Sequence, residues 1–169
     1  MKDDLGKLLL HTGDVALRRR ARWLIERLGP HNGDKILGVG CGDGYYLYLL
    51  ANLNLNIKLF GVEKDKNALS SANRNLKDKK YQLTLGDIYK LPFKDKVFDF
   101  SFCSHLLEHV ANPAIAIKEI TRISKSGYLE IPNGVIETVQ PFVSHLWFVY
   151  RDRNKLIFVR KSKKIHEVL

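Results

Sequence analysis

Four glycines alternate with other residues in the segment Gly38-Val39-Gly40-Cys41-Gly42-Asp43-Gly44. Because glycine has no Cβ, such a segment can turn sharply and approach a ligand closely. It lies between an apolar run typical of a strand and a predicted helix, so free amides at the helix start would suit a phosphate or a carboxylate. A glycine-rich turn alone does not identify a ligand. The class of ligand is inferred from the acidic residues that follow the turn.

Two acidic residues come at the ends of later apolar runs. Glu63 ends one run, 63 − 44 = 19 residues after Gly44. In doubly wound folds an acid about 20 residues on accepts hydrogen bonds from ribose hydroxyls. Asp87 follows the next run in Gly86-Asp87-Ile88, and ligands of such folds bind outside the carboxyl ends of the strands. Together the glycines and the two acids indicate a pocket for an adenosine with an acidic or zwitterionic tail.

The elements that must position these residues alternate along the chain. Runs typical of strands cover residues 35–40, 59–63, 81–85, 98–103 and 127–131. Helical patterns cover residues 14–28, 45–51, 67–76 and about 113–124. This alternation predicts an α/β, doubly wound Rossmann-like fold, with a mostly parallel sheet and helices on both faces. Two further runs, 145–150 and 155–160, predict a C-terminal antiparallel hairpin, and residues 135–144 leave room for at most a shortened crossover helix.

Length and composition narrow the class of protein. With 169 residues, 45% of them hydrophobic, the chain suits one domain with a sizeable core. We expect a helical arm at 1–28, a cofactor-binding core at 34–133 and a terminal hairpin at 145–160. Two cysteines exclude a disulfide scaffold and a zinc site built mainly of thiolates. No stretch approaches the ~20 apolar residues of a membrane span, and a cytoplasmic location is expected.

Several short motifs in this order resemble the class I S-adenosylmethionine-dependent methyltransferases. They are the glycine segment, Gly61-Val62-Glu63, Gly86-Asp87-Ile88, Leu91-Pro92-Phe93, Phe98-Asp99, Leu107-Glu108-His109-Val110 and Glu119-Ile120-Thr121-Arg122-Ile123. Each motif is common, whereas their order and spacing over about residues 34 to 133 are specific.

The resemblance implies S-adenosyl-L-methionine as cofactor and nine residues that bind it: Gly40, Cys41, Gly42, Glu63, Lys64, Asp87, Ile88, Cys103 and Ser104. The two glycines would lie under the methionine portion. Glu63 would hold both ribose hydroxyls, and Asp87 would accept from the adenine amino group while the Ile88 amide meets a ring nitrogen. Cys103 and Ser104 would offer backbone carbonyls to the methionine amino group.

Two positions depart from the family pattern. The family usually has an acid where Gly38 stands, so cofactor affinity could be modest unless another acid such as Asp43 compensates. Lys64 replaces an apolar residue that often packs on adenine, although its aliphatic stem can cover the ring.

The chemistry implied is in-line transfer of a methyl group from the sulfonium to an O, N, S or C atom of an acceptor. The protein aligns the acceptor and excludes water, so a catalytic residue is hard to identify. His105 is a weak candidate base, and His145 a weaker one. The sequence after the fourth strand resembles that of enzymes acting on small molecules. We expect residues 1–28 to cover the substrate, with residues 11–20 near the cofactor, or a second subunit to do so.

Alternatives remain open. The basic clusters at 18–22 and 151–164 leave an RNA or protein acceptor possible. The fold could also serve as a non-catalytic cofactor-binding subunit. A nicotinamide oxidoreductase is disfavoured because the third glycine of G-x-G-x-x-G is missing. A zinc hydrolase using His105, Glu108 and His109 is disfavoured because Pro113 ends that segment within about one turn, and we expect no metal.

Overall fold

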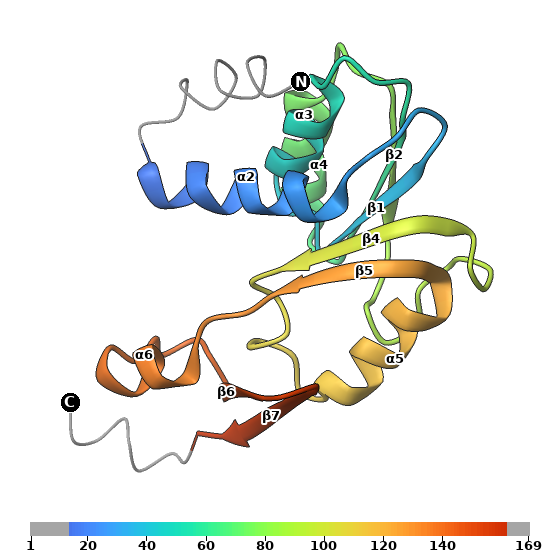
Figure 1. Cartoon of the computed structure of the whole chain (residues 1–169). Coiled ribbons are helices and arrows are strands. Elements are labelled where there is room, and N and C mark those ends of the chain that lie inside the picture. Colours follow the sequence, from blue (N-terminus) through green and yellow to red (C-terminus); the bar gives the residue numbers. More distant parts are fainter. Residues whose placement is uncertain (1–13, 162–169) are drawn as a thin grey trace.

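A five-stranded parallel sheet forms the centre of the computed structural model, which describes residues 14–161 (Figure 1). Its strands are β1 (Lys35–Val39), β2 (Lys58–Glu63), β3 (Tyr81–Leu85), β4 (Phe98–Ser104) and β5 (Ser124–Glu130). Their order across the sheet is β3-β2-β1-β4-β5. The order reverses between β1 and β4, and the crevice outside that reversal is where ligands of such sheets bind. The predicted α/β doubly wound fold is confirmed.

Helices cover both faces of the sheet (Figure 1). On one face lie α2 (Val15–Leu28), α3 (Tyr45–Ala51) and α4 (Lys66–Asn75), and on the other lies α5 (Pro113–Ile123). The side chain of Asp14 accepts from the Leu17 amide at 3.0 Å and caps α2, while left-handed Gly29 ends it. Asn112 caps α5 in the same way, ahead of Pro113.

The core divides into two apolar layers because neighbouring residues of a strand point to opposite faces. On β1, Ile36 packs with the layer under α2 and α3, which also contains Leu24, Leu47 and Phe102. Leu37 and Val39 pack with the layer under α5, which also contains Val62, Phe98, Cys103 and Ile120. Strand β1, buried on both faces, reads as a nearly continuous apolar run, whereas β4 alternates phenylalanines with smaller or polar residues; both patterns are typical of strands.

The C-terminal hairpin forms its own two-stranded sheet, in which β6 (Trp147–Asp152) pairs antiparallel with β7 (Lys155–Arg160). The short helix α6 (Gly134–Val139) precedes it, where a shortened crossover was predicted. The turn is tighter than predicted, with Asp152 paired to Lys155 and left-handed Arg153 between them. Trp147 Nε1 donates to the Val110 carbonyl at 2.8 Å and ties the hairpin to the segment after β4.

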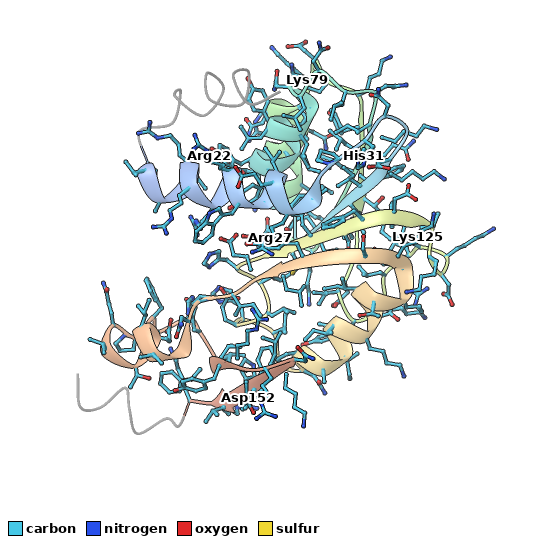
Figure 2. The ribbon with its side chains drawn as sticks, viewed as in Figure 1. Arg22, Arg27, His31, Lys79, Lys125 and Asp152 are labelled. Carbon is cyan, nitrogen blue, oxygen red and sulfur yellow. The ribbon has the colours of Figure 1, made fainter. Side chains whose placement is uncertain are left out.

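Strand β5 begins at Ser124, three residues before the predicted start. Its first half is polar because Lys125, Ser126 and Gly127 are exposed at the edge of the sheet. Ser124 nevertheless pairs with Phe98 of β4. Labelled basic side chains, including Arg22, Lys79 and Lys125, are spread over different parts of the surface (Figure 2). In the part of the chain that the structure describes, no helix is long and apolar enough to cross a membrane.

Candidate functional site

A cavity of about 330 Å³ opens at the carboxyl ends of three neighbouring strands. Its walls come from the ends of β1 and β2, from the segment after β3 and from the segment after β4. Five of the nine predicted cofactor residues line it: Gly40, Glu63, Lys64, Asp87 and Ile88. The sheet therefore brings together the residues predicted to surround an adenosine.

Two features of the glycine loop require glycine at position 40: its backbone conformation and the close approach of a neighbouring side chain. Gly40 has φ +65°, and a Cβ built there would lie 2.5 Å from Cδ2 of Leu106. Its amide and that of Cys41 donate to the Val62 carbonyl at 2.9 and 3.1 Å. These bonds fix the loop to the end of β2. A side chain at position 40 would be excluded both by strain and by contact with the cavity wall.

Glu63 links the end of β2 to the glycine loop. Its carboxylate accepts from the amide of Gly42 at 3.0 Å, from that of Lys64 at 2.8 Å and from that of Asp65 at 2.9 Å. An ionised carboxylate has about four acceptor positions. Three amides therefore leave capacity for a further donor, such as a hydroxyl in the cavity.

Asp87, in the segment after β3, also lines the cavity. Its carboxylate accepts from the Tyr89 amide at 3.0 Å and from Lys64 Nζ at 3.0 Å. The pKa of Asp87 is lowered first by the Tyr89 amide and then by Lys64. Lys64 thus lies over the cavity with its ammonium on Asp87, so an amino donor binding to Asp87 must share or displace that ion pair.

The missing acid at position 38 has a steric explanation. A Cβ built on Gly38 would lie 2.9 Å from Cζ of Phe102, which is 3% exposed. Phe102 packs edge-on against Tyr46, with 5.9 Å between ring centroids. The space beside position 38 is therefore filled by an aromatic ring on the neighbouring strand.

The remaining predicted residues lie beside the cavity but do not line it. These are Cys41, Gly42, Cys103 and Ser104. Burial raises the pKa of each thiol to about 12, with smaller contributions from the charge of Glu63 at Cys41 and of Glu108 at Cys103, which supports packing rather than nucleophilic roles. Ser104 Oγ donates to Glu130 at 2.5 Å. That the carbonyls of residues 103 and 104 bind a ligand stays a prediction.

His105 occupies a strained position just beyond β4. Its φ is +51°, which is uncommon for a residue with a side chain. Arg20 Nη1 lies 2.7 Å from Nε2, and Nδ1 lies 3.2 Å from Glu108 Oε1. Because a guanidinium only donates, Nε2 accepts and is not free to act as a base while Arg20 is in place.

The contact with Arg20 places α2 beside the end of β4, while the covering of the substrate by the N-terminal arm stays a prediction. Residues 11–13 of the predicted arm lie outside the described residues. Tyr46 also faces this end of the sheet: burial raises its pKa, the charge of Glu130 adds to the rise, and Ser104 and Arg20 oppose it. We call the polar group at this end of the sheet the β4-end cluster; it consists of Arg20, Tyr46, Ser104, His105 and Glu130.

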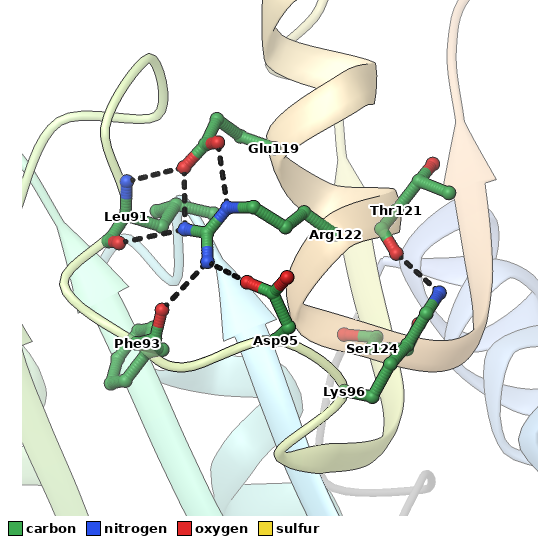
Figure 3. Close-up of polar contacts among 8 residues, drawn as sticks. All are labelled: Leu91, Phe93, Asp95, Lys96, Glu119, Thr121, Arg122 and Ser124. Atoms are coloured by element: carbon green, nitrogen blue, oxygen red, sulfur yellow. Dashed lines mark hydrogen bonds and ion pairs between the residues drawn. The ribbon is translucent and has the colours of Figure 1, made fainter.

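Arg122 of α5 holds the loop that forms one wall of the cavity (Figure 3). Its guanidinium donates to the carbonyls of Leu91 and Phe93 at 3.1 and 2.8 Å, and to Asp95 at 2.7 Å. Glu119 binds Arg122 and accepts from the Leu91 amide at 3.0 Å. Leu91 lines the cavity, so this network positions a wall from behind.

Sequence reasoning missed several wall residues: Tyr89, Leu106, His109, Val110 and Ala111. Most belong to the irregular segment after β4. Its Leu-Glu-His-Val pattern was recognised as a motif, but only the folded chain shows that it turns back across the ends of β1 and β2.

Comparison with known proteins assigns the family. Residues 37–130 match the sequence family described as a methyltransferase domain, and the chain belongs to that family. It is 27% identical over 134 residues to a demethylmenaquinone methyltransferase of Geobacillus stearothermophilus, covering 75% of this chain and 56% of that protein. It is 31% identical over 112 residues to a ubiquinone biosynthesis O-methyltransferase of Thiobacillus denitrificans, covering 64% and 47%.

The fold is that of solved methyltransferases. A putative methyltransferase from Bacillus halodurans superposes with a TM-score of 0.63 at 21% identity, covering 75% of this chain and 61% of that one. The chain spans only 34% to 56% of the length of the curated relatives it matches. The resemblance to class I methyltransferases seen in the sequence is thereby confirmed.

The cofactor of this family, S-adenosylmethionine, fits the site. Its adenine suits a cavity walled by Val39, Val62 and Leu91 with Asp87 at the rim, and its ribose hydroxyls suit the remaining acceptor capacity of Glu63. Nothing lies within 4 Å of a Cβ built on Gly42, so the glycine loop leaves open space for the amino acid tail.

Proposed function

We propose that the chain binds S-adenosylmethionine in this cavity and transfers its methyl group to a small-molecule acceptor. The observation that carries the proposal is the convergence of Glu63, Asp87 and the glycine loop at the ends of adjacent strands. Each group suits one part of the cofactor, and the adjacency of β3, β2 and β1, whose ends carry the three groups, supports the proposal.

The cofactor, when bound, supplies an activated methyl group, and the chain supplies position and shielding. Glu63 and Asp87 orient the adenosine by accepting hydrogen bonds. The apolar walls exclude water from the adenine. The β4-end cluster lies beyond the glycine loop, on the side of the predicted methionine contacts, and we assign the acceptor to it.

Within the β4-end cluster, Arg20 Nη1 donates to Nε2 of His105 at 2.7 Å and occupies the lone pair that a base would use. This arrangement orients an acceptor through hydrogen bonds and suits an acceptor that is already a good nucleophile. An acceptor hydroxyl that needs a base would require Arg20 to move off Nε2. The names of the quinone-related relatives support an acceptor of the small-molecule class.

The first test is binding of S-adenosylhomocysteine by calorimetry, with NAD as a parallel ligand. We expect one selective site per chain. A saturable response to NAD and none to S-adenosylhomocysteine would overturn the proposal.

The second test is methyl transfer from labelled S-adenosylmethionine to a panel of phenols, quinols, amines, RNA and protein. Turnover of a small molecule supports the proposal. Labelling of RNA or protein alone would overturn the acceptor class, and tight cofactor binding without turnover would indicate a non-catalytic subunit.

Arg20→Ala tests the assignment of the acceptor to the β4-end cluster. We expect a lower kcat/KM for the acceptor with an unchanged Kd for S-adenosylhomocysteine. Arg22→Ala, an exposed residue of the same helix, is the matched control.

A further inference from the structure

Two histidines and a glutamate meet behind the cavity wall. Glu108 and His109 lie in the segment after β4, and His145 lies two residues before β6. One potential ligand atom of each side chain lies within 4.8 Å of the others. Among residues 14–161, this is the one group of three His, Cys, Asp or Glu side chains with that property.

Both histidines present a free ring nitrogen because the other nitrogen is engaged. His109 Nδ1 lies 3.1 Å from the Ser144 carbonyl, which can only accept, so Nδ1 carries the proton. His145 Nδ1 lies 2.9 Å from Glu137 Oε2. In the neutral form of each ring, a proton on Nδ1 leaves the lone pair on Nε2. Orientation of a histidine by a carboxylate or a carbonyl is the usual support of a metal ligand.

The carboxylate of Glu137 already has its own partners. It accepts from the Phe142 amide at 2.8 Å, from Lys161 Nζ and from His145 Nδ1. Lys161 Nζ forms a buried ion pair with the Glu137 carboxylate. The positive charge of Lys161 is thus committed to Glu137 and does not serve Glu108.

Within residues 14–161, the buried carboxylate of Glu108 lacks a cation to compensate its charge. It is 1% exposed, and neither carboxylate oxygen has a well-formed hydrogen bond within that range, although His105 Nδ1 lies 3.2 Å from Oε1. An unpartnered buried carboxylate is costly. The adjacent His105 is already engaged by Arg20 at its other ring nitrogen, Nε2. A cation held between Glu108 and the two free imidazole nitrogens would supply both the charge and the ligation.

We propose that Glu108, His109 and His145 bind one divalent transition-metal ion of the zinc type. Two imidazoles and a carboxylate are a common three-ligand set for this ion, and they leave one position for water or an acceptor oxygen. His109 also lines the cavity, which puts the metal beside the space assigned to the cofactor. The site differs from the H-x-x-E-H reading of the sequence, because both nitrogens of His105 are occupied by Arg20 and Glu108.

The ion would also join distant parts of the chain. His145 belongs to the segment that leads into the hairpin, whereas Glu108 and His109 follow the central strand β4. Binding would therefore fix the hairpin against the cavity wall, in addition to the bond from Trp147 to Val110. The proposal goes beyond the proposed function and does not depend on it.

The test is zinc binding by the untagged full chain, stripped with a chelator and titrated by competition calorimetry, with metal content measured independently. We expect one ion per chain. Glu108→Gln, His109→Ala and His145→Ala should each weaken binding by at least 100-fold, since loss of even a supporting partner costs about 10–100-fold. His31→Ala, on an exposed ring, should retain binding. His105→Ala, which removes a neighbour of Glu108 Oε1 at 3.2 Å, should lose less affinity than His145→Ala.

Absence of stoichiometric zinc in the parent chain, or unchanged affinity in His145→Ala, would overturn the proposal. Equal loss in His105→Ala and His145→Ala would do the same by pointing to the H-x-x-E-H set. If a variant does not fold, the visible absorption spectrum of the cobalt-substituted parent chain tests the site instead. A four- or five-coordinate d–d spectrum with nitrogen and oxygen ligands supports the site, and a hexa-aqua-like spectrum contradicts it.

Discussion

Phe102 accounts for the most conspicuous departure of this chain from its family. The acid expected at position 38 would project into the space that the phenyl ring fills, because the Gly38 Cβ position lies 2.9 Å from Cζ. Position 38 and position 102 face each other on paired strands. A side chain at position 38 would therefore need the Phe102 ring to move or to be replaced by a smaller group.

Gly38→Ala should lower the free energy of unfolding by about 1–3 kcal/mol, the usual cost of overpacking a core. Urea denaturation measures it. The double variant Gly38→Ala with Phe102→Leu should lose less than the sum of the two single variants, because the smaller side chain removes the contact. Strict additivity would mean that the ring is not the obstacle.

Glu63→Gln tests the most central residue of the proposed cofactor site. A hydrogen bond to a charged group contributes about 1.5–3 kcal/mol, so affinity for S-adenosylhomocysteine should fall by about 10- to 100-fold. Calorimetry gives the value. Glu26→Gln, an exposed acid on α2, is the control, and equal affinity of the parent and the Glu63 variant would remove Glu63 from the site.

Residue types and spacing were enough to find Glu63, Asp87 and the glycine loop, because strand ends share one edge of a parallel sheet. They were not enough to find the partnership of His145 with Glu108 and His109. That contact depends on how the segment before β6 returns to the core, which no local periodicity encodes.

At the scale of elements, α5 does more than cover the sheet. Through Arg122 and Glu119 it holds the backbone of the loop around Leu91 (Figure 3). The planar guanidinium reaches two carbonyls and two carboxylates at once, which a lysine ammonium cannot reproduce in the same geometry.

Arg122→Lys should loosen residues 91–96 and weaken cofactor binding several-fold without unfolding the chain. Hydrogen exchange measures the first effect and calorimetry the second. Lys118→Ala, an exposed residue of the same helix, should change neither. Unchanged exchange in the Arg122 variant would show that the loop holds its shape unaided.

The elements themselves were predicted well where apolar periodicity is strong. Strand β3 and helix α3 have the predicted bounds. The start of β5 was placed late because its exposed first residues give no apolar signal. The turn of the hairpin was drawn too wide, since the charged run 151–154 reads as a loop although two of its residues pair.

For the whole molecule, ionised carboxyls tie stability to pH. The Tyr89 amide and Lys64 lower the pKa of Asp87, Lys125 and the Lys35 amide lower that of Asp99, and Arg122 lowers that of Glu119. The ordinary values are 3.8 for Asp and 4.5 for Glu. Because the folded values lie below these, the unfolded chain binds more protons in acid.

We therefore expect the stabilising contribution of these groups to be complete above about pH 5 and to be lost as the pH falls through 4.5 and below. Thermal unfolding between pH 3 and 7 measures the slope. Asp99→Asn, which removes one partner of Lys125 on β5 (Figure 2), should flatten it. A slope that is the same in both chains would show that Asp99 titrates alike in the folded and unfolded states.

The pairing of β1 with β4 has a consequence for synthesis of the chain. Ile36 lies beside Phe100, so 100 − 36 = 64 residues separate two neighbours at the centre of the sheet. Between completion of β2 at Glu63 and of β4 at Ser104, a ribosome adds 41 residues, which takes about 2–8 s at 5–20 residues per second. Throughout that interval the edge of β1 that pairs with β4 has unpaired backbone N–H and C=O groups. We expect nascent chains halted before residue 104 to depend on chaperones, and chains released after it to fold unaided.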